Sequence, residues 1–173
     1  MGFEIERKYL IKMPDREVLL SQASCVCDRI EQTYLLSEKG VTARVRKREN
    51  QDRAEYTHTE KRRLTPVTCI EDERIITEEE YLKLLDNKNP SLSSVKKLRY
   101  SFPCGKRIAE IDVYPFWDKV AILEIELEDE NEEITFPDFV AVIREVTEKR
   151  QFKNRAIAEK IPDITELLKN TDI

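Results

Sequence analysis

The chain has 173 residues, of which 40% are hydrophobic, and this length and composition favour one domain with an ordinary core over two. Charged residues make up 38% of the sequence, yet acids and bases nearly cancel to a net charge of -5. The pI near 5.2 argues against a nucleic-acid partner, because such proteins usually carry a basic surplus. With three glycines, the chain cannot supply a glycine-rich phosphate loop or a dinucleotide fingerprint, so any bound phosphate must be held by side chains.

The cysteines and the single histidine form no recognisable metal or nucleophile motif. Cys25, Cys27, Cys69 and Cys104 lack the paired spacing of a structural zinc site, and we expect reduced thiols. His58 cannot build a multi-histidine site and is expected to be a solvated strand residue. The sequence shows no N-terminal apolar targeting region and no long apolar span, so we expect a cytoplasmic protein that does not bind membranes.

Residues 3–11 alternate apolar and charged positions, which is the two-residue period of a strand. Pro14 and Asp15 then open a short helix over residues 16–23. Polar turns separate the strand-like stretches that follow, and this spacing predicts hairpins. The further predicted strands cover residues 29–37, 41–48, 54–60, 69–77, 95–102, 107–114 and 119–128.

Helices are predicted between and after these strands. Thr77 precedes three glutamates and is the expected N-cap of a helix that runs to about Asn87. After Pro137 the spacing of apolar residues predicts further helices. The sequence therefore predicts a single domain over residues 1–173, of the α+β class and mainly β, with a helical C-terminal segment at about 137–173. The helices predicted in that segment cover residues 139–146, 154–160 and 164–169.

The strands separate charged from apolar side chains, because residues two apart point to the same face. For a single strand, solvent on the charged side is the usual explanation. Segregation of charges by sign over many strands instead favours a closed sheet with its ionic face inward. The charged groups are Glu4, Glu6 and Lys8; Arg44, Arg46 and Arg48; Lys97 and Arg99; Glu110 and Asp112; and Glu124, Glu126 and Glu128.

A lumen lined with like charges needs a ligand to supply partners, because buried ions lose their hydration. Carboxylates suit hard divalent cations, and the candidate ligands for Mg²⁺ or Mn²⁺ are Glu4, Glu6, Glu124 and Glu126. Basic side chains suit a polyphosphate, since arginine offers a planar fork and lysine a point charge. The candidate phosphate contacts are Arg44, Arg46, Lys61, Lys97 and Arg99, whereas the two arginines after Lys61 are expected in the turn.

The N-terminal Glu4-Ile5-Glu6-Arg7-Lys8 resembles the Glu-x-Glu-x-Lys signature of CYTH proteins. The resemblance departs before Glu71, where close bacterial relatives often have arginine and this chain has Cys69 and Ile70. The order of bases around Arg150 also differs slightly. Otherwise it covers nearly the whole chain, through Arg44-Val45-Arg46, Lys61, Glu71-Asp72-Glu73, Lys97-Leu98-Arg99, Glu110-Ile111-Asp112, Glu124-Ile125-Glu126 and a tail from Val146-Thr147-Glu148 to Lys153-Asn154.

This resemblance implies a closed eight-stranded antiparallel β-barrel, or tunnel, with helices packed on the outside. It also implies a divalent metal held by acidic residues and a small triphosphate gripped by inward bases. Lys8, Arg150 and Lys153 join the substrate contacts on this ground, and a homodimer is a further implication. The family includes inorganic triphosphatases, thiamine triphosphatases and class IV adenylyl cyclases.

The expected activity is metal-dependent hydrolysis of a triphosphate, with inorganic triphosphate as the first candidate. Glu6 is expected to act at the metal, and Glu73 or Glu126 to take the proton of the attacking water. Cyclisation of ATP to cyclic AMP is an alternative and needs a nucleobase pocket. A non-catalytic polyphosphate or nucleotide-binding module is a second alternative, and a structural barrel with self-paired ions is a third.

Overall fold

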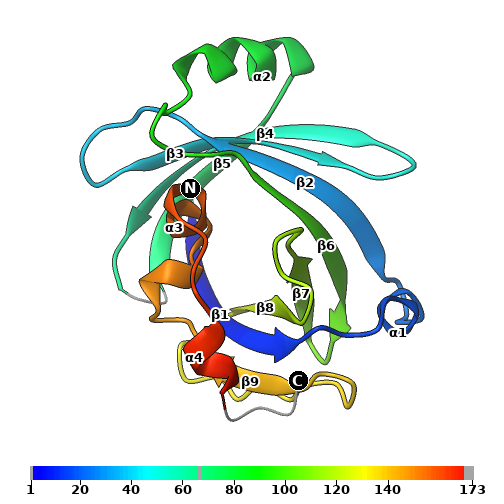
Figure 1. Ribbon diagram of the computed structural model, residues 1–173. Helices are drawn as coiled ribbons and strands as arrows, with labels where there is room; N and C mark the ends of the chain where they lie inside the picture. The colour runs from blue at the N-terminus through cyan, green and yellow to red at the C-terminus, as the bar shows by residue number, and fades with distance from the viewer. Residues whose placement is uncertain (1, 66–67, 170–173) are drawn as a thin grey trace.

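The computed structural model of the chain describes residues 2–65 and 68–169, apart from the side chains of residues 2–4. The strands of these ranges form one antiparallel sheet in the order β5-β4-β3-β2-β6-β7-β8-β1-β9. A further pairing of β1 with β5 closes the first eight into a barrel (Figure 1), which confirms the predicted fold class. The barrel strands are β1 (Gly2–Lys12), β2 (Val26–Tyr34), β3 (Thr42–Glu49), β4 (Ala54–Arg63), β5 (Thr68–Ile76), β6 (Val95–Cys104), β7 (Arg107–Val113) and β8 (Val120–Leu127).

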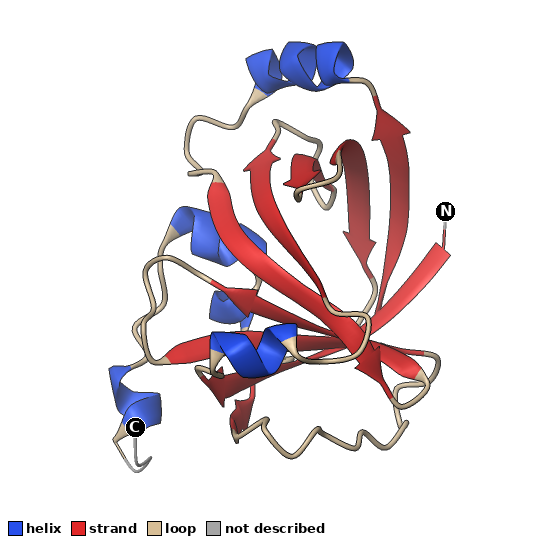
Figure 2. Ribbon diagram, turned by 90° about the vertical axis from the view of Figure 1, so that its right-hand side faces the viewer, coloured by secondary structure: helices blue, strands red, loops and turns tan. Residues whose placement is uncertain are grey.

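The apolar faces of the strands lie on the outside of the barrel, where helices and loops cover them (Figure 2). α1 (Arg16–Leu20) buries Leu19 in a cluster on β1, β6, β7 and β8, which also includes Val140 from the segment after β8. α2 (Glu78–Leu84) places Tyr81 against apolar residues of β3 and β5. The short 3₁₀ turn η1 (Leu85–Asn87) continues it. The predicted N-cap is confirmed, since Thr77 Oγ1 accepts a hydrogen bond from the Glu80 N–H at 3.1 Å.

One edge of β1 brings the C-terminal segment to the barrel wall. The first residues of β1 pair with β5, and residues 9–11 pair with β9 (Val142–Glu145). The chain then forms η2 (Arg150–Phe152), α3 (Asn154–Glu159) and α4 (Thr165–Leu168). Phe152 and Ile157 pack with Tyr114 and Trp117 in an apolar cluster. This packing holds the C-terminal segment beside the inner face of the barrel.

The helix predicted over residues 139–146 is wrong, because Val142–Glu145 forms strand β9. The apolar residues of this stretch serve two different clusters. Val140 packs on the outer cluster, whereas Val146 belongs to the cluster with Phe152. The edge of β1 beyond β5 offers backbone groups that need partners, and pairing with them outweighs a weak local helical period.

The other elements lie close to where the sequence predicts them. β2 differs most, since it spans Val26–Tyr34 rather than residues 29–37. The last two predicted helices are present as α3 and α4. No helix within the described ranges is long and apolar enough to cross a membrane. That residues 1–173 form one domain stays a prediction.

Candidate active site

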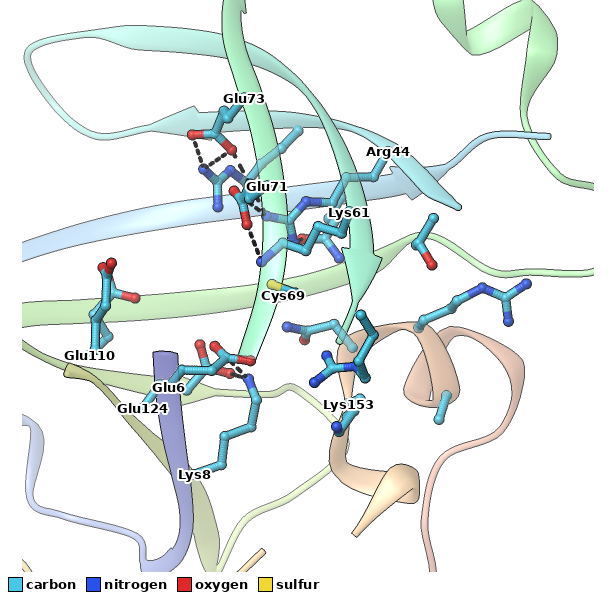
Figure 3. Close-up of a pocket in the computed structure, with 18 of the residues that line it drawn as sticks. Glu6, Lys8, Arg44, Lys61, Cys69, Glu71, Glu73, Glu110, Glu124 and Lys153 are labelled. Atoms are coloured by element: carbon cyan, nitrogen blue, oxygen red, sulfur yellow. Dashed lines mark hydrogen bonds and ion pairs between the residues drawn. The ribbon is translucent and has the colours of Figure 1, made fainter. Parts of the chain in front are cut away.

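The charged faces of the strands line an internal cavity of about 820 Å³. Among the side chains that the structure describes, eleven lysines and arginines and seven glutamates line it, although the whole chain has a net charge of -5. Figure 3 shows part of this lining, with labelled lysine, arginine and glutamate side chains that come from several strands and from the C-terminal segment. The excess of four positive charges favours an anionic ligand, because low-dielectric walls concentrate the field of the charges that line a cavity.

β1 and β8 form an acidic wall of this cavity. Glu6 lies directly opposite Glu126 across the strand pair, and on the next strand Glu110 lies opposite Glu124. Carboxylates directly across from one another repel, so this wall needs cations between its members. Glu4 belongs to the same strand, but its side chain lies outside the described part of the structure, and its metal role stays a prediction.

Lys8 supplies positive charge to the acidic wall. Its Nζ donates a hydrogen bond to Glu124 and lies 3.4 Å from a carboxylate oxygen of Glu6. Burial alone would lower the pKa of Lys8, but the charges of Glu124 and Glu6 outweigh burial and raise it. Burial alone would raise the pKa of Glu124, but Lys8 and Arg99 hold it well below its usual value. Lys8 and Glu124 are therefore both charged in the folded protein.

Lys97 and Arg99 of β6 are tied to the wall carboxylates. Arg99 donates to Asp112 at 2.6 and 2.7 Å and to Glu124 at 2.6 Å, and it also donates to Glu110. Lys97 donates to the same Asp112, which is fully buried. Burial and the charge of Arg99 lower the pKa of Lys97 to about 8. Both predicted phosphate contacts line the cavity, but a phosphate must compete with carboxylates for their donors.

Arg44 and Arg46 of β3 have fewer partners of opposite charge than Arg99 has. Arg44 donates to Gln32 at 2.9 Å and lies 3.9 Å from both Glu71 and Glu73. Arg46 donates to the two oxygens of Glu73 at 3.1 and 3.0 Å. The Nε atoms of both arginines are buried without a hydrogen-bond partner. Burial and the charge of Arg44 lower the pKa of Arg46 to about 10, so the protein alone does not fully stabilise this guanidinium.

β4 and β5 form a wall of mixed charge. Lys61 is ion-paired with Glu71, which lies opposite it across the strand pair. Glu73 accepts from Thr59 at 2.7 Å as well as from Arg46. Both oxygens of Glu73 therefore already accept hydrogen bonds.

The C-terminal segment contributes Lys153 to the cavity lining. Burial and the charge of Arg63 lower the pKa of Lys153 to about 8. Its neighbour Asn154 accepts a hydrogen bond from Tyr114 at 2.7 Å, which ties the start of α3 to the residue after β7. Arg150 reaches only the rim, since its side chain is 83% exposed. Lys153 is therefore the stronger of the two tail candidates.

Several lining residues are missing from the set that the sequence predicts. Arg63 was expected in a turn, but it ends β4 on the lumen face two residues after Lys61, so that expectation is wrong. The two-residue period of the strand, continued from Lys61 to Arg63, identifies Arg63 as a residue of the lumen face. Gln32 and Tyr34 of β2 also line the cavity, and Gln32 donates to the Tyr34 hydroxyl at 2.6 Å. Arg155 comes from α3, and no strand pattern could place it there.

The acidic wall has the donor chemistry for a divalent ion. Glu6, Glu124 and Glu126 all line the cavity with carboxylate oxygens, which Mg²⁺ and Mn²⁺ prefer. Within the described residues, however, no three acidic, cysteine or histidine side chains are arranged to hold an ion. Lys8 already pairs with two of the three glutamates. The residue types fit a divalent ion, and in this structure the cation beside Glu6 and Glu124 is Lys8.

The fold is shared with solved structures, although no protein-family model and no curated protein matches the sequence. The inorganic triphosphatase NE1496 is 26% identical with a TM-score of 0.57, over 94% of this chain and 99% of that one. The closed eight-stranded barrel and this similarity are consistent with the CYTH family. PH1819 from Pyrococcus horikoshii OT3 shares the fold with 21% identity and a TM-score of 0.55, over 74% of this chain and 80% of that one. HpAC1 from Hippeastrum, a putative adenylyl cyclase described as having a dominant triphosphatase activity, shares the fold with 14% identity and a TM-score of 0.50, over 72% of this chain and 80% of that one.

The CYTH signature strand is β1, which presents Glu6 and Lys8 to the lumen. The departure from the CYTH pattern at Cys69 does not leave that part of the lumen without positive charge. Cys69 lies opposite Arg63 in the β4–β5 pair, and Lys153 lines the same cavity. Arg63 and Lys153 thus bring positive charge to the part of the lumen that contains Cys69.

Proposed function

We propose that this CYTH protein hydrolyses inorganic triphosphate to pyrophosphate and phosphate with the help of a divalent metal ion. The observation that carries the proposal is the excess of positive charge in a lumen that also has one acidic wall. The fold similarity to the inorganic triphosphatase NE1496 at 26% identity supports the same reaction class.

The phosphates bind to the basic side chains whose charge the protein's own carboxylates neutralise least. Arg44 and Arg46 each have a buried Nε without a partner, and a phosphate oxygen beside β3 provides the missing acceptors. Lys61 and Lys153 line the same cavity and add point charges. Lys97, Arg99 and Lys8 also contact the phosphates where a phosphate oxygen replaces the carboxylate oxygens that now accept their hydrogen bonds.

Phosphoryl transfer then depends on position and charge more than on a nucleophilic side chain. Glu6, Glu124 and Glu126, with Glu4 as a further candidate, would hold a divalent ion, which would supply positive charge for the phosphoryl transfer. Glu73 or Glu126 takes the proton of the attacking water, and Glu73 already accepts hydrogen bonds from Arg46 and Thr59. The bases on β3 hold the remaining phosphates in line.

The lining favours inorganic triphosphate over a nucleotide. A nucleobase needs a flat apolar or aromatic surface, and Tyr34 is the only aromatic residue among the described side chains that line the cavity. Its ring is 4% exposed, and its hydroxyl is already bonded to Gln32. Cyclisation of ATP, which requires a positioned nucleoside, is therefore the less favoured reaction.

The proposal is tested by product analysis on three substrates. Inorganic triphosphate, ATP and thiamine triphosphate are each incubated with the protein and Mg²⁺, Mn²⁺ or EDTA, and phosphate, pyrophosphate and cyclic AMP are quantified. We expect metal-dependent phosphate release that is fastest from inorganic triphosphate. Cyclic AMP with pyrophosphate from ATP would identify a cyclase instead. A raised melting temperature with triphosphate but no turnover would identify a binding module.

A further inference from the structure

Lys8 lies where the acidic wall is expected to hold a metal ion. Its Nζ donates to Glu124 and lies 3.4 Å from Glu6, which are two of the carboxylates that the proposed function assigns to the ion. Lys8 is only 4% exposed and Glu124 is only 7% exposed, so bulk water screens the contact between them weakly. The protein therefore places a cation of its own between the donors of the acidic wall.

The other partner of Glu124 strengthens this arrangement. Arg99 donates to the second oxygen of Glu124 at 2.6 Å, so both oxygens of that carboxylate already face bases. Within the described part of the chain no group of three potential metal ligands is assembled. A divalent ion that approaches the protein alone must displace an ammonium group held by the buried Glu124 and the partly buried Glu6, which is electrostatically unfavourable.

A triphosphate changes this balance, because it offers Lys8 another set of negative oxygens in the same cavity. Lys8 has a flexible four-carbon stem, and its ammonium group is a point charge that can exchange one oxygen partner for another. When Lys8 turns to a phosphate, Glu6 and one oxygen of Glu124 become available to a metal ion. These two glutamates would then hold the ion, and the ion would supply positive charge for the bound triphosphate.

We propose that Lys8 is an internal counter-ion that blocks divalent-metal binding until a triphosphate has entered the tunnel. The inference rests on the proposed function, which it deepens by setting the order of binding. Triphosphate binds first, the metal ion second, and each raises the affinity for the other, since coupling between two ligands is reciprocal.

The test measures Mn²⁺ binding without any phosphate, from the electron paramagnetic resonance signal of free Mn²⁺. The wild type is compared with Lys8→Met and with the matched control Lys61→Met. The control removes the same charge from the same cavity, but its lysine pairs with Glu71 on another wall. We expect Lys8→Met to bind Mn²⁺ at least about tenfold more tightly than wild type, because a unit charge is removed from contact with two glutamates. Lys61→Met should change the affinity less than about threefold.

A third variant locates the site. Glu6→Gln in the Lys8→Met background should abolish the gained affinity. The inference is overturned if the wild type binds Mn²⁺ as tightly as Lys8→Met, or if Lys61→Met gains as much. Circular dichroism checks that each variant is folded, and Lys8→Gln replaces Lys8→Met if the latter is not.

Phosphate release from triphosphate by the wild type, measured in parallel, keeps the two proposals separate. Hydrolysis together with tight Mn²⁺ binding by the free wild type refutes only the role of Lys8. Absence of hydrolysis together with the predicted gain in Lys8→Met refutes only the proposed reaction.

Discussion

Replacing Arg46 with glutamine should make the protein more stable and its substrate binding weaker. Arg46 is a base whose pKa is lowered in the folded state, from 12.5 to about 10, by burial and by the charge of Arg44. A lowered pKa means that folding disfavours the charged form, and this penalty is fully present below pH 10. The shift corresponds to roughly 3 kcal/mol at about 1.4 kcal/mol per pKa unit.

Part of this gain is offset in the variant. Arg46→Gln loses packing of the side chain and the two hydrogen bonds to Glu73. We therefore expect a net rise in the free energy of unfolding on the order of 1 to 2 kcal/mol. The same change removes charge-assisted bonds to phosphate worth about 1.5 to 3 kcal/mol, so KM for triphosphate should rise about 10- to 100-fold.

Arg48→Gln is the matched control for Arg46→Gln, since Arg48 is two residues further on the same strand face. Arg48 donates to Asp28, which is fully buried, and Asn50 is the other partner of that carboxylate at 2.7 Å. Loss of Arg48 leaves Asp28 without its counter-charge and should destabilise the protein by about 3 kcal/mol. Urea unfolding at pH 7 measures both variants, and steady-state phosphate release gives KM. The reasoning is refuted if Arg46→Gln is less stable than wild type or if its KM is unchanged.

Three further predictions concern the pH dependence of KM, the pH dependence of stability, and the barrel exterior. Lys97 and Lys153 have pKa values lowered to about 8, so each loses its charge as the pH rises above 8. KM for triphosphate, measured from pH 7 to 9.5, should therefore rise by up to about tenfold per pH unit for each lysine that contacts phosphate. A KM that does not change with pH would show that neither lysine contacts phosphate. The same lowered pKa values should make the free energy of unfolding rise between pH 8 and about 10.5, since the unfolded chain then binds more protons. Leu123 is fully buried in the cluster on the outside of the barrel. Leu123→Ala should therefore lower the free energy of unfolding by about 2 to 5 kcal/mol and leave KM at 20 °C unchanged. A large change in KM would mean that the barrel exterior helps to shape the lumen.

The two-residue period carries most of what can be predicted from the sequence. It places Glu6, Lys8, Arg44 and Arg46 on inner faces, because parity within one strand does not depend on which strands are neighbours. Closure of the sheet followed from the segregation of charge by sign, since an open sheet has no reason to sort its solvated charges. The metal and catalytic roles of these residues stay predictions.

Features that depend on packing between distant segments could not be predicted in the same way. The edge of β1 beyond β5 exists only after the barrel has formed, and it is this edge that turns Val142–Glu145 into a strand. The sequence shows the sign of each charge but not its partner, so it did not predict that Arg99 is shared by Asp112, Glu110 and Glu124. Those partners come from β7 and β8, and their distances depend on the register of the closed sheet.

The central claim is that the acidic wall of a basic tunnel supports metal-dependent hydrolysis of triphosphate. It is tested most directly by phosphate release from inorganic triphosphate with Mg²⁺ or Mn²⁺, for the wild type, Glu6→Gln and the control Glu31→Gln. Glu31 is a glutamate of β2 that lies 3.6 Å from Lys96 and is absent from the cavity lining. We predict rapid release that EDTA abolishes, a loss of at least about 100-fold in Glu6→Gln, and little change in Glu31→Gln. Release that persists in EDTA, or equal rates for the wild type and Glu6→Gln, would contradict the claim.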